Sequence, residues 1–373
     1  MTHGTQILLV SAQAAPNLLA ALDPDLKPRR AILLVSRKMT APGQALHAVL
    51  TEAGVQAQIE ALDDEHDYQQ LENTLLRLAE QYSDEPIALN LTGGTKLMAL
   101  AAQSVAQAYN WPSFYVDIDT DEVIWLGPEN RRKPLASPLR LRHYLRSYGF
   151  TIEGGIEKPQ LDARRQQLVQ TLIRQIGSLE EPIAQLNWIA QQAEDRRQLT
   201  APLTDAQQDS RKLEALLRHF EDAGVLRTEG KTLRFPSEAD LAFTKGGWLE
   251  HYVYGALGSL GQSVRDKAAN LTVTDQKGVR NELDVAFMAR NRLFVVECKT
   301  ARMDRERDAK ANDTLFKLSE ICRRVGGLGT RGLLASYRKL REPERKLAAA
   351  VGIRLVCGPE LMRLDEQLRD WIK

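Results

Sequence analysis

The stretch from residue 281 to residue 300 constrains the fold of this chain more than any other, because it combines a hairpin pattern with charges at fixed positions. Residues 282–288 and 293–299 alternate in character as short β-strands do, and Arg290 and Asn291 form a polar turn between them. A hairpin folded about that turn has a single register. The spacing therefore predicts which residues of the two strands face each other.

In this register Asp284 lies opposite Glu297, and Glu282 lies opposite Lys299, with the facing Cβ atoms about 5 Å apart on one face. Three carboxylates and one ammonium then meet at one end of the hairpin. Charge on a strand usually marks a solvated face, so a solvated hairpin is the simplest alternative. The rest of the hairpin argues against that alternative.

Both faces of the hairpin are otherwise largely apolar. The charged face also carries Ala286, Met288, Leu293 and Val295, and the other face carries Leu283, Val285, Phe287, Phe294, Val296 and Cys298. Facing carboxylates destabilise a strand pair unless a cation lies between them. We therefore expect a buried site for a hard divalent ion, Mg²⁺ or Mn²⁺.

Asp284, Glu297 and the backbone carbonyl of Cys298 are the expected metal ligands. Lys299 would hold the attacking water or neutralise a phosphorane-like transition state, and Glu282 would help to complete the site. This combination of groups suits the hydrolysis of phosphodiesters.

The sequence around these residues resembles the PD-(D/E)xK nuclease motif: Asp284 on one strand and Glu297-Cys-Lys299 on the next. Leu283 stands where the family name has proline, which removes no chemical group from the site. The predicted helix in 246–254 is similar to the first helix of that fold, and the resemblance implies that its Glu250 belongs to the site.

Residues 1–126 alternate strand and helix signals, which is typical of a mostly parallel sheet with helices on both faces. Such sheets bind ligands at the carboxyl ends of their strands. Short segments rich in polar residues follow three predicted strands. The candidate ligand-binding residues in them are Ser11, Ala12, Gln13, Ser36, Thr92, Gly93, Gly94, Thr95 and Lys96.

The segment 92–96 is the most informative of the three, because its two glycines open a long predicted helix. Backbone N–H groups there can approach an anion at the positive end of the helix, so a phosphate is the expected guest. The segment matches neither an ATP P-loop nor a dinucleotide fingerprint. A glycine-rich start to a helix, with no ligand, is the alternative interpretation.

The sequence between the two predicted domains has the pattern of a helical segment followed by a helix and a hairpin. Residues 161–197 are helical in pattern, and a helix over 210–224 precedes a hairpin over 225–235 that turns at Glu229-Gly230. This order is typical of winged-helix modules, which bind DNA or serve as spacers and dimer contacts, and we favour the spacer. Residues 127–138 contain three prolines and are interpreted as a linker.

The composition indicates which partners the protein can bind and in which cellular compartment it works. The formal charge of +1 excludes a uniformly basic protein. Residues 299–346 nevertheless hold fourteen Lys and Arg against seven Asp and Glu, a local net charge of +7 beside the predicted site.

The three cysteines, Cys298, Cys322 and Cys357, lack metal-ligand spacing, as expected in a reducing compartment. No apolar run is long enough for a membrane helix, so we expect a cytoplasmic protein without a membrane partner.

Taken together, these features resemble the CARF-domain ancillary nucleases of type III CRISPR systems. The resemblance implies three parts: a Rossmann-like CARF domain (1–138), a helical, winged-helix-like segment (139–240) and a PD-(D/E)xK restriction-endonuclease-like α/β domain (241–373). It also implies an activator, cyclic tetra-adenylate, that switches on cleavage of DNA, RNA or both in antiviral defence.

A cyclic tetranucleotide presents the same half to two identical partners, so we expect a homodimer that encloses one ligand between two chains. The 127–138 linker and the middle helices would then transmit activation. Two other functions remain open: a cyclic-oligonucleotide-sensing transcription regulator that acts through the winged-helix-like segment, and a stand-alone DNA-repair nuclease. A transcription regulator would not explain the buried carboxylates, whose desolvation is costly. A stand-alone repair nuclease would not explain the N-terminal domain.

Overall fold

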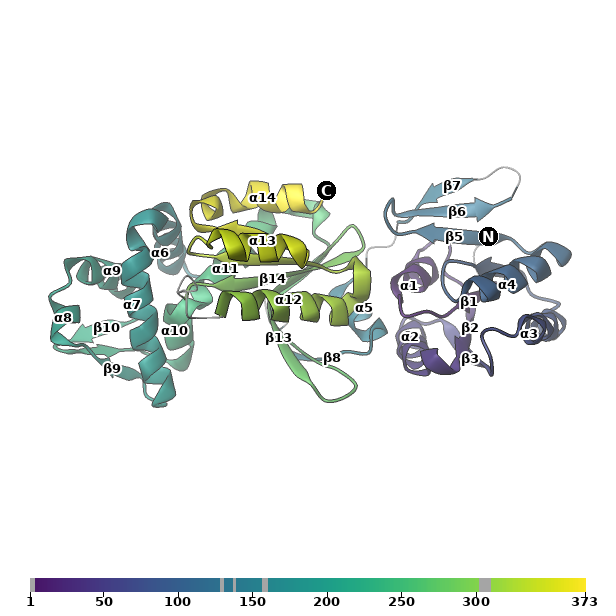
Figure 1. The fold of residues 1–373 in the computed structure, drawn as a ribbon, viewed down its shortest axis with the longest axis horizontal. Coiled ribbons are helices and arrows are strands. Elements are labelled where there is room, and N and C mark those ends of the chain that lie inside the picture. The colour runs from purple at the N-terminus through teal and green to yellow at the C-terminus, as the bar shows by residue number, and fades with distance from the viewer. Residues whose placement is uncertain (1–3, 128–130, 137–138, 156–159, 302–309) are drawn as a thin grey trace.

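The computed structural model describes residues 4–127, 131–136, 139–155, 160–301 and 310–373. They form an elongated molecule with the N-terminal domain at one end, the C-terminal sheet in the centre and the middle segment at the other end (Figure 1). Within these ranges no helix combines the length and the apolar character needed to cross a membrane. The predicted mixed α/β class is confirmed, with three sheets.

The N-terminal domain is built on parallel strands with helices between them. The strands are β1 (Thr5–Leu9), β2 (Arg30–Ser36), β3 (Gln56–Leu62), β4 (Ile87–Asn90) and β5 (Ser113–Asp117), and the helices are α1 (Ala15–Leu22), α2 (Thr40–Glu52), α3 (Tyr68–Gln81) and α4 (Lys96–Ala108), with a 3₁₀ turn η1 (Arg37–Met39). The sheet order is β3-β2-β1-β4-β5-β6-β7. Leu8 and Val10 pack with α1 and α2, whereas Ile7 and Leu9 pack with α3 and α4, so helices cover both faces.

The segment interpreted as a linker is part of this sheet. After β6 (Glu122–Leu126), residues Arg132–Pro134 form β7, which pairs with β6 in antiparallel orientation. The Lys133 Nζ atom lies 2.5 Å from an Asp25 carboxylate oxygen, and the backbone N–H of Ala136 donates to Asp23 at 2.7 Å. These bonds hold 132–136 against the domain, whereas proline content alone suggested a free connection.

The middle segment has the predicted helix and wing. It contains α6 (Ala163–Arg174), α7 (Ile176–Asp195), β9 (Thr200–Pro202), α8 (Asp205–Gln208), α9 (Arg211–Asp222), β10 (Arg227–Glu229), β11 (Thr232–Arg234) and α10 (Glu238–Ala242). Ser210 caps α9, and Gly230 turns the β10–β11 hairpin as predicted, with a φ of +61°. The three strands form a small sheet in the order β10-β11-β9.

The C-terminal domain is a six-stranded sheet in the order β16-β15-β14-β13-β12-β8. Its elements are η2 (Phe243–Gly247, a π-helix), α11 (Trp248–Ala256), η3 (Leu257–Ser263), β12 (Asp266–Thr274), β13 (Arg280–Ala289), β14 (Arg292–Lys299), α12 (Lys310–Gly326), η4 (Gly327–Gly329), β15 (Arg331–Ser336), α13 (Glu342–Ala350), β16 (Ile353–Cys357), η5 (Gly358–Arg363) and α14 (Leu364–Trp371). Its edge strand β8 (Thr151–Gly154) comes from the segment 139–240 that we had assigned to the middle, because the exposed edge of β12 pairs with it.

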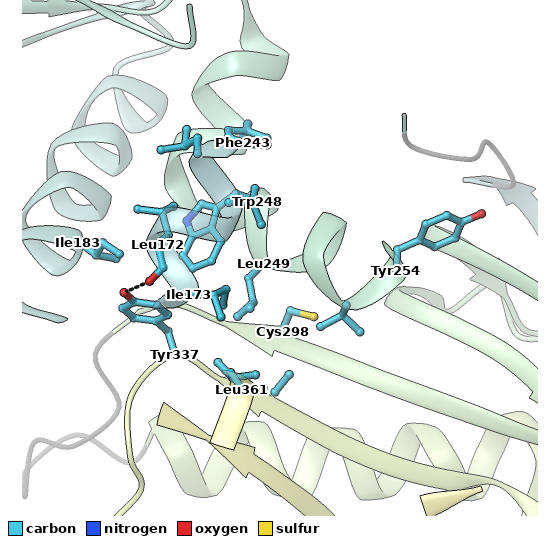
Figure 2. Packing of buried hydrophobic residues seen from close by; sticks show 14 of the residues in the cluster. Leu172, Ile173, Ile183, Phe243, Trp248, Leu249, Tyr254, Cys298, Tyr337 and Leu361 are labelled. Carbon is cyan, nitrogen blue, oxygen red and sulfur yellow. Dashed lines mark hydrogen bonds between the residues drawn. The ribbon is translucent and has the colours of Figure 1, made fainter. Parts of the chain in front are cut away.

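Two apolar cores join the parts. One core packs the middle helices and α11 on one face of the C-terminal sheet, and Figure 2 shows Trp248, Leu172 and Tyr337 within it. There the Tyr337 hydroxyl donates a hydrogen bond to the Leu172 carbonyl oxygen at 2.9 Å. The other core runs from α1 and α2 through α5 (Leu141–Ser147) to the opposite face of the C-terminal sheet.

The middle segment therefore does not lie between the two larger domains, although it lies between them in sequence (Figure 1). The N-terminal domain instead reaches the C-terminal domain directly, at the turn of the β13–β14 hairpin. Asn291 donates to Asp121 at 3.0 Å, and Arg292 donates to Asp119 at 2.6 Å. The expectation that the middle helices transmit activation does not fit this arrangement.

We predict that Phe294→Ala lowers the free energy of unfolding by about 3–5 kcal/mol. The Phe294 ring is buried, stacks on Phe287 at 4.9 Å and meets the edge of Trp371 at 4.8 Å. Phe316→Ala is the matched control, because Phe316 is 54% exposed on α12 and its loss should cost no more than about 0.5 kcal/mol. Urea unfolding measures both, and equal losses would contradict the packing described here.

Candidate functional site

The β13–β14 hairpin has the register that the sequence predicts. Val285 of β13 pairs with Val296 of β14, and the ladder runs from there to Ala289 and Arg292. Arg290 and Asn291 have φ values of +47° and +54°, as a two-residue type I′ turn requires. The ladder ends at Val285 and Val296, one residue before the two facing carboxylates.

One prediction about the faces of this hairpin is wrong. Leu283 packs with Ala286 on one side of the sheet, while Val285 packs on the other side. The regular alternation breaks at Asp284, opposite Asn270 of β12, and Asn270 has a φ of +51°. The side chains of β13 therefore stop alternating between the two faces of the sheet at Asp284.

Lys299 lies between the two predicted carboxylates. Its Nζ atom is 2.5 Å from Glu297 Oε1 and 3.8 Å from Asp284 Oδ2. Asp284 Oδ2 also accepts a hydrogen bond from the Cys298 backbone N–H at 2.7 Å. The Asp284 and Glu297 side chains are only 16% and 20% exposed. Lys299 thus supplies one positive charge between two carboxylates.

The electrostatics of the site show a shortage of positive charge. Burial and the neighbouring charges of Asp284 and Glu282 raise the pKa of Glu250 to about 8. Burial and the charge of Glu297 also raise the pKa of Asp284 well above its ordinary value. Burial lowers the pKa of Lys299, but Glu297 and Asp284 more than offset this and raise it, so Lys299 stays protonated.

The five predicted groups meet from two sides. Glu250 on α11, together with Glu282 and Lys299, lines a cavity of about 1000 Å³ between the middle segment and the sheet. Asp284 and Glu297 do not line this cavity but contact Lys299, which does. The structure thus places the five predicted site residues close together, and their catalytic roles stay predictions.

The donor atoms fit a hard divalent ion. Within the described ranges, no three His, Cys, Asp or Glu side chains converge closely enough to hold an ion by themselves. Mg²⁺ typically takes one or two carboxylates and keeps several waters, and Asp284 and Glu297 meet that requirement. Burial keeps the pKa of the Cys298 thiol high, so Cys298 would contribute its backbone carbonyl and not its sulfur.

At the N-terminal domain, the segment Thr92–Lys96 forms the predicted tight loop at the start of α4. A Cβ atom on Gly93 would lie 2.0 Å from the Leu9 carbonyl oxygen, so only glycine lets this loop meet the end of β1. Gly94 has a φ of +71°, and the Thr95 hydroxyl caps α4 by accepting from the Met98 N–H. We call Ser11–Gln13 and Thr92–Lys96 the strand-end loops.

Two buried amides that sequence reasoning missed hold these loops together. Asn17 donates to the Leu9 carbonyl at 2.8 Å, and Asn90 donates to Asn17 at 3.1 Å. Asn90 also accepts from the Thr92 hydroxyl at 2.6 Å, and Thr92 in turn accepts from the Val116 N–H at 2.7 Å. An Asn at the end of an otherwise apolar strand is the signal that could have indicated this network.

The remaining candidates of the N-terminal domain differ in accessibility. Ala12 is exposed and Ser11 half-buried, whereas Ser36 is buried at the end of β2. The Gln13 side chain points toward the C-terminal domain, where its Oε1 accepts from the Tyr148 hydroxyl at 3.2 Å and its amide lies against Gly327. Gln13 thus connects a strand-end loop to the end of α12.

Two family models match the chain. The model described as the Card1 CARF domain matches residues 5–144, and the model described as the Card1-like endonuclease domain matches residues 237–373. Fold and site together define a nuclease with an N-terminal CARF domain. The chain belongs to the CARF-domain ancillary nucleases of type III CRISPR systems.

Solved structures resemble nearly the whole chain. Protein VC1899 from Vibrio cholerae is 28% identical, with a TM-score of 0.90 over 99% of this chain and 97% of its own. Can2 from Sulfobacillus thermosulfidooxidans, solved with cyclic tetra-adenylate, is 25% identical, with a TM-score of 0.84 over 100% of both chains.

A more distant match shows the fold alone. A type III CRISPR defence DNA nuclease activated by cyclic oligoadenylate is 20% identical, with a TM-score of 0.58 over 90% of this chain and 45% of its own. No curated protein matches the sequence.

Proposed function

We propose that this protein is a nuclease that cyclic tetra-adenylate activates and that cleaves DNA, RNA or both with the help of Mg²⁺ or Mn²⁺. The observation that carries the proposal is the buried meeting of Asp284 and Glu297 with Lys299 in an endonuclease domain. The activator is inferred from the similarity to Can2, which was solved with cyclic tetra-adenylate. The transcription-regulator alternative leaves this desolvated cluster without a purpose.

The side chains of the site have separate roles in this proposal. Asp284 and Glu297 bind the ion, and Glu250 and Glu282 add negative charge on the cavity side. The ion supplies positive charge that stabilises the reacting phosphate. Lys299 contacts both carboxylates, so its ammonium can donate a hydrogen bond to the attacking water or to a phosphate oxygen.

The strand-end loops are the proposed binding surface for the activator. Lys96 is exposed at the first position of α4, where a positive side chain is unfavourable beside the positive end of the helix. A bound phosphate would convert this repulsion into attraction, because both the helix and Lys96 would then face an anion.

We propose that two copies of the chain enclose one cyclic ligand. Ala12 and Lys96 are the exposed residues of the strand-end loops, and a two-fold axis through the ligand would present the same loops from both sides. Leu100, on the helix that these loops open, is 61% exposed. An apolar side chain in that position is what a dimer contact would cover.

Activation needs a contact that differs between resting and active arrangements, since a ligand with equal affinity for both shifts nothing. Two of the contacts between the domains are suited to this role. Gln13 joins a strand-end loop to Tyr148 and to Gly327, and Arg292 joins the hairpin turn to Asp119. We propose these contacts as the transmitters, in place of the middle helices.

We predict that Asp284→Asn and Glu297→Gln each abolish cleavage of plasmid DNA and single-stranded RNA in the presence of Mn²⁺ and cyclic tetra-adenylate. Both changes keep side-chain volume but remove a hard anionic ligand. In the parent, Mn²⁺ at about 100 times its dissociation constant should stabilise the fold by about 2.7 kcal/mol, and the variants should lose that gain.

Glu366→Gln is the matched control for this experiment, because Glu366 is exposed on α14. It should cleave and respond to Mn²⁺ as the parent does. Near-normal turnover in either site variant would exclude the site as described, and a retained Mn²⁺ response without turnover would move the ion elsewhere.

We predict that Lys96→Glu weakens binding of cyclic tetra-adenylate by about 1.5–3 kcal/mol, plus the repulsion of the new carboxylate. Cleavage would then need far more activator. Calorimetry measures the affinity, and Lys346→Glu, an equal change of charge at an exposed position of α13, serves as the control. If Lys96→Glu binds as tightly as the parent, the activator site lies elsewhere.

The dimer predicts a stoichiometry of one ligand per two chains in calorimetry and a dimeric mass in light scattering. Leu100→Glu should shift the mass toward the monomer, because it places a charge in the proposed contact. Met362→Glu, a change at another exposed apolar residue, should not. One ligand per chain, or a monomer that still cleaves when ligand is added, would refute the arrangement.

A further inference from the structure

Part of the wall of the cavity beside the candidate site is formed by residues that have no role in the proposed reaction. It measures about 1000 Å³, and helix α7 of the middle segment lines it opposite Glu250 and Lys299. Gln185 and Trp188 of α7 both line this wall. A segment interpreted as a spacer therefore faces the reacting groups across a space at the upper end of the usual range for ligand pockets.

Trp188 is the unusual residue of this wall. It is 53% exposed, although Leu186, Ile189 and Ala190 beside it on α7 are fully buried. The other four tryptophans of the chain are buried or half-buried. Trp188 lies on the wall of a cavity that Lys299 also lines, and its indole presents a flat apolar face that the described residues leave half open.

Three polar atoms of residues that line this cavity also lack partners among the described residues. Asn187 Oδ1, Gln185 Oε1 and His251 Nδ1 are buried, line the same cavity and make no hydrogen bond with any residue that the structure describes. Buried polar atoms are normally paired, so these unpaired atoms leave hydrogen bonds at the cavity wall to be completed by water or by a ligand.

The position of Trp188 is fixed relative to the chemistry. Asn187, the preceding residue, donates from Nδ2 to the Thr300 hydroxyl at 3.0 Å, and Thr300 donates to the Lys245 carbonyl oxygen at 3.2 Å. Gly246 lets this contact form, because a Cβ atom there would lie 2.5 Å from the Thr300 hydroxyl oxygen. Thr300 follows Lys299 directly, so α7 is tied to the strand end that carries the candidate catalytic lysine.

We propose that Trp188 stacks on an unpaired base of the nucleic-acid substrate, next to the phosphate that is cleaved. The proposal rests on the nuclease function proposed above. Inside a duplex each base is stacked on both faces by its neighbours, whereas a single strand offers its bases to an aromatic side chain. The open indole face therefore selects single-stranded DNA or RNA, and the middle segment binds substrate instead of acting as a spacer.

The test measures steady-state cleavage of three reporter oligonucleotides by the full chain with cyclic tetra-adenylate and Mn²⁺: single-stranded DNA, single-stranded RNA and a blunt DNA duplex. Trp188→Ala should raise the KM for a single strand about 10-fold or more, with kcat within about 2-fold of the parent. Trp188→Phe should recover most of the loss, because it keeps an aromatic face. The KM for any duplex cleavage should not change.

Phe316→Ala is the control, since it removes an exposed aromatic ring outside the cavity. The strand whose KM changes, DNA or RNA, identifies the sugar that the subsite accepts. An unchanged KM for both single strands in Trp188→Ala, an equal change for single strand and duplex, or a failure of Trp188→Phe to recover the loss would overturn the proposal.

A second measurement separates failure of this proposal from failure of the nuclease function. Single-stranded oligonucleotide should quench the part of the tryptophan emission that is lost in Trp188→Phe. If the parent cleaves nothing, the nuclease function fails, and this quenching still decides whether Trp188 contacts a base. Quenching that is equal in the parent and in Trp188→Phe would exclude that contact.

Discussion

Desolvation of like-charged carboxylates at the end of the β13–β14 hairpin is the constraint on which the rest of the structure depends. Asp284 and Glu297 are tolerated there because Lys299 and the Cys298 N–H bind them directly. That arrangement needs a hairpin covered on both faces, and the two apolar cores provide the cover. The same cores attach the middle segment and the CARF domain to the nuclease sheet. The packing that buries the site therefore also holds the domains together.

Local sequence information was sufficient where a feature depends on neighbouring residues. The hairpin register followed from the position of the turn at Arg290 and Asn291, because a type I′ turn admits only one pairing of the flanking strands. The loop at Gly93 was predictable because two glycines before a helix indicate a close backbone approach. Glu250 came from a likeness to a known motif, since nothing in its spacing indicates where α11 packs.

Long-range packing determined what the sequence could not predict. The change of face at Asp284 depends on the φ of Asn270 in a neighbouring strand, which alternation within one hairpin does not report. β8 pairs with β12 across the whole middle segment, and no local pattern indicates such a partner. Trp188 resembles any apolar residue of an amphipathic helix until the opposite wall of its cavity is known.

The placement of β8 has a consequence for synthesis of the chain. Ribosomes deliver the N-terminal residues first, and all seven strands of the CARF sheet are available once β7 has emerged. The strand β8 emerges next and must wait for β12, so the nuclease sheet cannot close until the middle segment and most of the C-terminal residues have left the ribosome. A nascent chain therefore holds a folded CARF domain well before it holds a sheet capable of cutting nucleic acid.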